Sequence, residues 1–191
     1  MILGSHNTFT YLPAKKWWMK IIPGIGKCQE VKYETQYADY GVRLFDLRVR
    51  FDKHGKLIVC HGLAEYKMSK DDVIDFLSFL DYQGDSYCRV ELELRSKSKD
   101  ENFQKDCFKA FCTEITNLFP NVKFIGGDVM YSGENAYKFE NSLAYEEMHA
   151  SVCSPKIIDD WYPKYYAKRN NHTNIENFNG EALMIDFVNI Q

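Results

Sequence analysis

Short apolar runs alternate with stretches of helical periodicity along most of the chain. The runs have the length of strands, whereas the longer segments repeat their apolar residues at helical spacing. Strands are predicted at residues 2–5, 42–51, 57–61, 88–95, 122–125, 156–159 and 182–188. Helices are predicted at 33–40, 69–82 and 101–118 and in a Tyr-rich segment after 160, with a polar loop at 170–180. This alternation favours β/α units around a parallel sheet.

Local signals mark the ends of two of these helices. Ser69 is a strong N-cap residue, and Asp71 and Asp72 follow it in the first turn, where the helix dipole favours negative charge. Gly41 follows the helix predicted at 33–40 and is a typical helix stop.

Charged residues alternate with apolar residues in three predicted strands, although buried parallel strands are normally apolar on both faces. The charged residues of each strand share one face: Asp46, Arg48 and Arg50 in the first strand, Glu91, Glu93 and Arg95 in the second, and Asp186 in the last. One interpretation is an antiparallel sheet with a solvated face. The other is a small barrel with a polar mouth, whose charges pair with one another or with a charged ligand.

Two histidines lie at the ends of predicted strands. His6 follows the first strand and His61 ends the strand at 57–61. Because the active sites of parallel β/α barrels lie at the C-terminal ends of strands, these histidines favour the barrel with a polar mouth.

The same segments resemble the X-domain of phosphatidylinositol-specific phospholipase C. The similar segments are GSHNT at 4–8, Gln36 with YGVRLFDLRV at 40–49, CHG at 60–62 and MIDF at 184–187, with a weaker match at 157–162. The similarity is dense over residues 1–66 and thin afterwards. The order of its histidines and aspartates is more specific than any single segment.

The resemblance implies an α/β fold, a distorted TIM-type (β/α) barrel. Such barrels typically need about 250 residues. This chain has 191 residues, so we expect an abbreviated barrel that forms a single PLC-like phosphodiesterase domain over 1–191.

The resemblance also implies a catalytic set. His6 is expected to act as the general base toward the inositol 2-hydroxyl, and His61 as the general acid for the leaving oxygen. Asp186 is expected to orient His6, Asp46 to support the site, and Arg48 to stabilise the phosphoryl oxygens. These residue types suit the chemistry, because imidazoles change charge near neutral pH and guanidinium groups match phosphate geometry.

Position 48 bears on the metal question. Eukaryotic relatives bind calcium through two carboxylates in the second strand, whereas this chain has Asp46 and then Arg48. The resemblance is therefore to the metal-independent bacterial type, with no cofactor and no metal ligands, and with Ca²⁺ or Mg²⁺ as the minority alternative. Asn7 stands where the bacterial enzymes have an aspartate. Glu91 or Glu93 could restore a metal site if either reached Asp46 and Asn7.

Further residues are expected to contact the substrate or the membrane. Asn7, Glu93, Arg95 and Tyr162 are predicted substrate contacts. Trp17 and Trp18 stand among lysines, a combination that suits a membrane interface. The alternative is that both tryptophans pack under the rim of the barrel.

Charge and composition limit the possible partners. The net charge of −3 argues against nucleic acid, which needs a clustered cationic face. Hydrophobic residues make up 45% of the chain, enough for a sizeable core. We expect a monomer that binds a phospholipid or an inositol phosphate and makes peripheral membrane contact.

Other sequence features concern the compartment. No apolar run approaches the roughly 18 residues of a membrane span, and residues 1–6 show no secretory signal, so we expect a cytoplasmic location by default. The six cysteines include no C-x-x-C pair. They favour free thiols over disulfides and make a zinc site improbable.

The leading functional hypothesis is metal-independent cleavage of a phosphatidylinositol-like lipid by internal attack of a neighbouring hydroxyl. A second is a metal-dependent glycerophosphodiesterase or sphingomyelinase D-like enzyme. A third is an inactive phosphoinositide-binding module that has kept the pocket.

Overall fold

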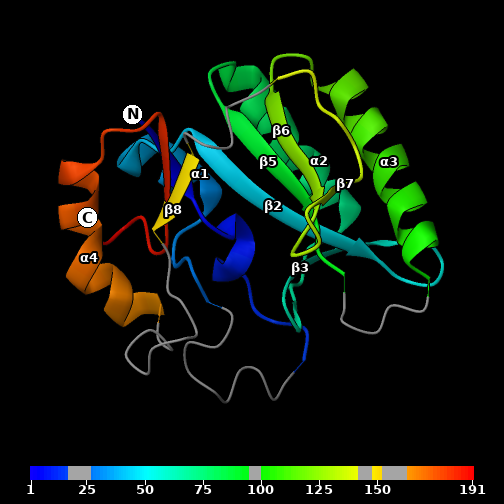
Figure 1. The fold of residues 1–191 in the computed structure, drawn as a ribbon, viewed down its shortest axis with the longest axis horizontal. Helices are drawn as coiled ribbons and strands as arrows, with labels where there is room; N and C mark the ends of the chain where they lie inside the picture. Colours follow the sequence, from blue (N-terminus) through cyan, green and yellow to red (C-terminus); the bar gives the residue numbers. More distant parts are fainter. Residues whose placement is uncertain (17–26, 95–99, 142–147, 152–162) are drawn as a thin grey trace.

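The computed structural model describes residues 1–16, 27–94, 100–141, 148–151 and 163–191. Its central sheet has the strand order β7-β6-β5-β2-β1-β9-β8 (Figure 1). The strands of this path are β1 (Ile2–Ser5), β2 (Leu44–Phe51), β5 (Tyr87–Leu92), β6 (Lys123–Val129), β7 (Glu134–Asn135), β8 (Met148–Ser151) and β9 (Ala182–Ile185). The six strands from β6 to β8 on this path run parallel, and β7 pairs antiparallel with β6.

The helices lie around this sheet. They are the 3-10 helix η1 (Thr8–Tyr11), α1 (Tyr33–Tyr40), α2 (Lys70–Gln83), α3 (Glu101–Leu118) and α4 (Pro163–Asn177). Figure 1 shows α2 behind the central strands, α3 on the side of β7, and α4 at the opposite end near β8. No helix in the described ranges combines the length and apolarity that a membrane crossing requires.

The barrel prediction is confirmed only in part. The parallel strands and the helices between them are present, but the sheet is open: within the described residues its edges are β7 and β8, which do not pair with each other. The antiparallel interpretation of the central sheet is wrong, since β2 pairs parallel with both β1 and β5 and all eight of its residues are buried.

The strand predicted at 57–61 exists, but it forms no parallel barrel unit. It is β3 (Leu57–His61), which pairs antiparallel with β2 and continues into β4 (Ala64–Glu65). The reason is the short turn between β2 and β3, where the Asp52 carboxylate accepts from the backbone N–H groups of His54 and Lys56. A parallel neighbour needs a crossover of a dozen or more residues, which this turn cannot provide.

The predicted helix ends are confirmed at two positions. Ser69 forms a capping box with Asp72 at the start of α2, and Gly41 ends α1 in the left-handed conformation with φ 69°. The polar loop predicted at 170–180 is wrong over its first part, because α4 continues to Asn177. Asn171 explains this difference: it is fully buried, and its side-chain amide donates to the carbonyl oxygens of Asp186 and Ile190.

Two further strand predictions need correction, and a third lies outside the described residues. The last strand ends at Ile185, because Phe187 adopts the left-handed conformation with φ 50°. The strand at 88–95 ends at Leu92 in the structure. The strand predicted at 156–159 lies outside the described residues.

The core packs the apolar face of β2 against α2. Phe76 of α2 is fully buried, and its ring centroid lies 4.8 Å from that of Phe9, 4.9 Å from that of Tyr33 and 5.6 Å from that of Phe45. This aromatic cluster fixes the loop after β1 to the strand that carries the charged face, and so it supports the geometry of the site.

Phe76→Ala is therefore expected to lower the free energy of unfolding by about 3–5 kcal/mol, because it removes a buried ring and leaves a cavity. Tyr82→Ala in the same helix is the matched control. Tyr82 is 88% exposed, so its loss should change stability by no more than about 0.5 kcal/mol. Urea denaturation of the two variants measures the difference; equal losses would contradict this account of the core.

Candidate active site

The register of three parallel strands brings the candidate residues together. Ser5 at the end of β1 pairs with Phe45 of β2 on one side and with Ile185 of β9 on the other. The residues that follow these three partners are His6, Asp46 and Asp186. Three polar side chains from distant parts of the chain thus lie close together where β1 and β9 end.

His6 is held from both sides of its ring. Its Nδ1 lies 2.7 Å from Asp186 Oδ1, and its Nε2 lies 2.7 Å from Arg48 Nη2. A carboxylate only accepts and a guanidinium only donates, so these contacts assign the proton to Nδ1 and leave the lone pair on Nε2. His6 is therefore in the tautomer that accepts a proton at Nε2.

Asp46 connects the cations of the site. One of its oxygens accepts from Arg48 Nε at 2.9 Å and from the backbone N–H of Asn7 at 3.0 Å, and the other lies 3.4 Å from Arg89 Nη1. Burial alone would raise the pKa of this carboxyl, but Arg48 and Arg89 lower it below its usual range. Asp46 is therefore an anion at neutral pH.

Arg48 keeps its charge although it is buried. Burial disfavours the charged guanidinium, but Asp46 and Glu93 outweigh this effect and raise the pKa of Arg48 above its usual value. Arg48 forms an ion pair with Asp46, as expected for charges on one strand face that pair with one another. The contact of the same guanidinium with His6 adds a second role, because it places a fixed positive charge beside the candidate base.

Asn7 shapes the loop after β1. It adopts the left-handed conformation with φ 48°, which asparagine tolerates better than most residues. Its side-chain nitrogen lies 3.0 Å from His6 Nε2. An aspartate here would place a negative charge beside that nitrogen, whereas the amide adds none.

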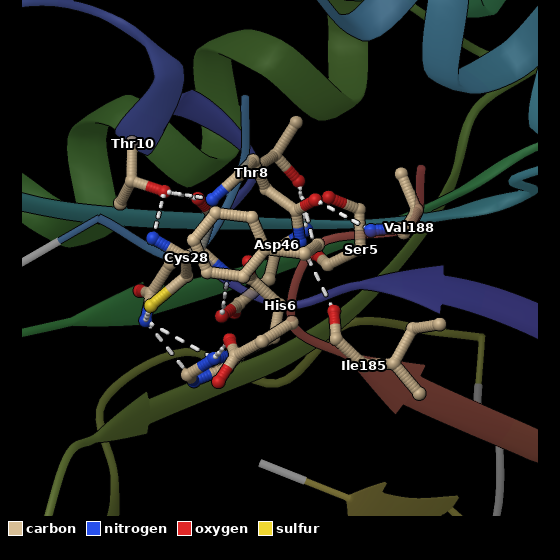
Figure 2. Close-up of polar contacts among 12 residues, drawn as sticks. Ser5, His6, Thr8, Thr10, Cys28, Asp46, Ile185 and Val188 are labelled. Carbon is tan, nitrogen blue, oxygen red and sulfur yellow. Dashed lines mark hydrogen bonds and ion pairs between the residues drawn. The ribbon is translucent and has the colours of Figure 1, made fainter. Parts of the chain in front are cut away.

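A network of neutral side chains supports this loop (Figure 2). The Thr8 hydroxyl accepts from the backbone N–H of Asp46, and the Thr10 hydroxyl accepts from the N–H groups of Cys28 and Gln29. The Gln29 side chain donates to the backbone carbonyls of both His6 and Ile185. It therefore joins the ends of β1 and β9, the two strands that supply the His6–Asp186 pair.

His61 lies on the other side of the site, at the end of β3. Its ring centroid is 6.1 Å from that of His6, and the two rings stand at 78° to each other. Glu93 Oε1 accepts from the backbone N–H of Gly62 at 2.7 Å, which fixes the turn that follows His61. This hydrogen bond therefore links Glu93 to the turn after His61 and not to Asp46.

Glu91 is buried beside Arg89, with Arg89 Nε 3.0 Å from its Oε1. Burial raises the pKa of the Glu91 carboxyl and outweighs the positive charge of Arg89, which lowers it. The negative charges of Asp46 and Asp128 raise this pKa further. The pKa of Glu91 is raised to about 8. Glu91 is therefore largely protonated at neutral pH.

The structure brings together most of the residues singled out in the sequence, and some lie outside its described part. His6, Asn7, Asp46, Arg48, His61, Glu93 and Asp186 converge on one site. Arg95, Tyr162, Trp17 and Trp18 are not among the described residues.

Sequence reasoning missed two participants, Cys28 and Arg89. Arg89 shares the strand face of Glu91, so extending the alternation by two residues would have found it. Cys28 is buried, and the Asn7 side-chain nitrogen lies 3.7 Å from its Sγ. Burial, followed by the nearby Asp186, raises the pKa of this thiol well above its usual value. No local pattern in the sequence marks Cys28.

The donor set gives little support to the calcium alternative. Among the described residues, the potential ligand atoms that lie within 4.8 Å of one another belong to His6, Cys28 and Asp186. Ca²⁺ prefers oxygen ligands, and this group offers an imidazole and a thiol with one carboxylate. Asp46, the carboxylate that the alternative needs, faces two guanidinium groups instead.

Comparisons with known proteins identify the fold. No protein-family model and no curated protein matches the sequence. A structure of phosphatidylinositol-specific phospholipase C from Staphylococcus aureus, from work on its membrane binding, is 14% identical with a TM-score of 0.61, covering 97% of this chain and 85% of that one. A single-mutant structure of the same enzyme is 12% identical with a TM-score of 0.63, covering 97% and 84%.

The chain has a phosphatidylinositol-specific phospholipase C-like fold. The resemblance to phosphatidylinositol-specific phospholipase C, which is dense in sequence only over residues 1–66, is therefore confirmed at the level of the fold across nearly the whole chain. In this phospholipase C-like fold, the middle of β2 and the ends of β1, β3 and β9 supply the polar side chains of the site.

The raised pKa of Glu91 predicts a pH-dependent effect of Glu91→Gln. The folded pKa of about 8 lies above the ordinary value of 4.5, so the stability that protonated Glu91 contributes is present below pH 4.5 and is lost as pH rises through about 8. Glutamine stays neutral. The free energy of unfolding of the variant should therefore rise relative to that of the wild type as pH rises from 5 to 8, by at most ~1.4 kcal/mol per pH unit.

Urea denaturation at both pH values measures this gain. Glu140→Gln replaces an exposed glutamate and serves as the control. A Glu91→Gln effect that is the same at both pH values would show that Glu91 stays ionised beside Arg89.

Proposed function

We propose that this protein is a phosphodiesterase that cleaves a phosphatidylinositol-like lipid by internal attack, without a metal ion. The observation that carries the proposal is the arrangement of His6, with a carboxylate at Nδ1, a guanidinium at Nε2 and a second imidazole 6.1 Å away. General acid–base catalysis needs a base and an acid on either side of the reacting group, and this arrangement offers both.

Each residue then has a defined part in the reaction. His6 Nε2 takes the proton of the hydroxyl that neighbours the phosphate, and Asp186 stabilises the imidazolium that forms. The freed oxygen attacks phosphorus and closes a cyclic phosphodiester. His61 gives a proton to the departing diacylglycerol oxygen, so that one proton is taken up and one is released.

Arg48 supplies the positive charge for the phosphate. Its guanidinium already stands at Nε2 of His6, and a phosphate that enters the site would meet both groups together. Donors that are fixed in advance stabilise charge that develops on phosphoryl oxygens, because they need no reorganisation during the reaction. This charge is the reason to propose a reaction that does not depend on a metal ion.

We also propose that the protein acts on lipid at a membrane surface. The support is the lipid substrate implied by the fold and the aromatic–cationic segment that holds Trp17 and Trp18. The solved relative of this fold was itself studied for its membrane binding.

Replacing either histidine should stop turnover of phosphatidylinositol. We expect His6→Ala and His61→Ala each to lower kcat by about 10²–10⁴-fold, the usual contribution of a general acid or base. His54→Ala is the matched control, because His54 is an exposed histidine in the turn after β2. It should keep the wild-type rate.

Two outcomes would contradict the proposal in different ways. Full activity in both variants would remove the two-imidazole mechanism. No turnover by the wild type, combined with binding of inositol phosphate that survives His6→Ala, would identify an inactive binding module instead.

The order of products tests internal attack separately. We expect ³¹P NMR of a reaction with an excess of chelator to show a cyclic inositol phosphate as the first product, formed at the same rate as without chelator. A direct release of the open phosphate monoester would indicate attack by water. A rate that falls on chelation and returns with Ca²⁺ or Mg²⁺ would favour the metal-dependent alternative.

A further inference from the structure

A cavity of about 550 Å³ lies at the far end of β2, apart from the His6 site. Arg50, Lys15 and Lys56 line it, together with Asp52, Glu65 and Gln104. Its volume lies within the range of ligand pockets. The hollow beside Arg48 is a different and much smaller one, lined by Asn7, Asp46 and Cys60 among others.

Arg50 is placed here by strand geometry. It lies two residues beyond Arg48 on β2, so the two side chains point to the same face of the sheet. Two residues of an extended strand span roughly 6.6 Å. The same alternation that supplies the cation of the His6 site therefore supplies a second cation further along the strand.

The guanidinium of Arg50 is buried and only partly bonded. The residue is 5% exposed, and its Nη2 donates to the carbonyl oxygen of Ala64 at 3.2 Å. Within the described part of the chain, Nε and Nη1 are buried and have no hydrogen-bond partner. A buried charge is costly unless it is paired and hydrogen-bonded, so the Arg50 side chain, which lines the cavity, is suited to an anionic ligand.

The neighbouring carboxylates leave the charge of Arg50 incompletely compensated. Glu65 Oε1 lies 3.9 Å from Arg50 Nη2, which is beyond hydrogen-bond distance. The Asp52 carboxylate accepts from two backbone N–H groups of its own turn. Lys15 and Lys56 are exposed, so the described lining residues place three cations and two carboxylates around this cavity.

We propose that this cavity is a second anion site, which binds a phosphate-type group beside the guanidinium of Arg50, with Lys15 and Lys56 at its rim. The ligand is either free phosphate or a second phosphate on an inositol phosphate headgroup. The proposal does not depend on turnover at His6, because Arg50 and the two lysines take no part in the proposed reaction.

Titration calorimetry with inorganic phosphate tests the site. We expect Arg50→Gln to weaken the binding at this site at least tenfold, because it removes the charge and a donor, and Glu65→Gln to strengthen it severalfold. Lys109→Gln is the matched control, since Lys109 is exposed on α3 and lies outside the cavity.

A double variant, Lys15→Gln with Lys56→Gln, covers the case in which Arg50→Gln does not fold. Both lysines are exposed, so this variant should keep its stability and weaken phosphate binding severalfold, more so at low salt. Phosphate binding that is unchanged in the double variant and in Glu65→Gln would overturn the proposal. So would binding that only Arg48→Gln removes.

Two headgroup probes distinguish the sources of the anion. If the second phosphate of a headgroup occupies the cavity, inositol bisphosphate should bind more tightly than inositol monophosphate, and the double lysine variant should remove the advantage. If free phosphate is the ligand, the two headgroups should bind equally, and inorganic phosphate should bind alongside either of them.

Discussion

The site depends on the alignment of three parallel strands, β2, β1 and β9, which are neighbours inside the sheet. Backbone pairing sets Ser5 level with Phe45 and with Ile185, and the next residue of each strand carries a polar side chain into the site. A slip of one residue would turn each side chain to the opposite face, so the register that builds the sheet also builds the His6–Asp186 contact. Gln29 reinforces this alignment, because its side chain bonds to carbonyl groups at the ends of both β1 and β9.

This alignment gathers charged side chains in the interior of the protein, where their desolvation costs free energy. Asp46 contacts Arg48 and Arg89, and both arginines are buried. Buried ion pairs are weak sources of stability, because desolvation offsets much of their attraction. Under the proposed function, the cluster holds Arg48 at Nε2 of His6, where a charge on a phosphate oxygen would be stabilised without rearrangement. Neutral Glu91 fits this view, since another anion beside Asp46 would weaken the positive field at the site.

Sequence reasoning found the residues whose signal lies in short-range patterns. The alternation in β2 marked Asp46 and Arg48, and the capping residues of α2 fixed its start at Ser69. Contacts between distant segments were beyond its reach. The buried amide of Asn171 extends α4 through a polar sequence that predicts a loop. Cys28 is held in the site by Thr10, which accepts from its backbone N–H, and by the backbone N–H of Phe187, which donates to its carbonyl oxygen. The open sheet follows likewise from pairings that no local pattern specifies.

The length of β2 explains why the fold offers a second cation beside a cavity. β1 pairs with β2 as far as Phe45, and β5 pairs with it as far as Val49. The last two residues of β2, Arg50 and Phe51, pair only with β3 within the described strands, while Gln104 of α3 bonds to the backbone of Phe51. The sheet thus narrows to a hairpin just where the alternating pattern places another buried cation. Pairing with β3, which carries His61, accounts for the length of β2. It does not account for the buried Nε and Nη1 of Arg50, which have no hydrogen-bond partner among the described residues, and an anionic ligand at this guanidinium would compensate its charge.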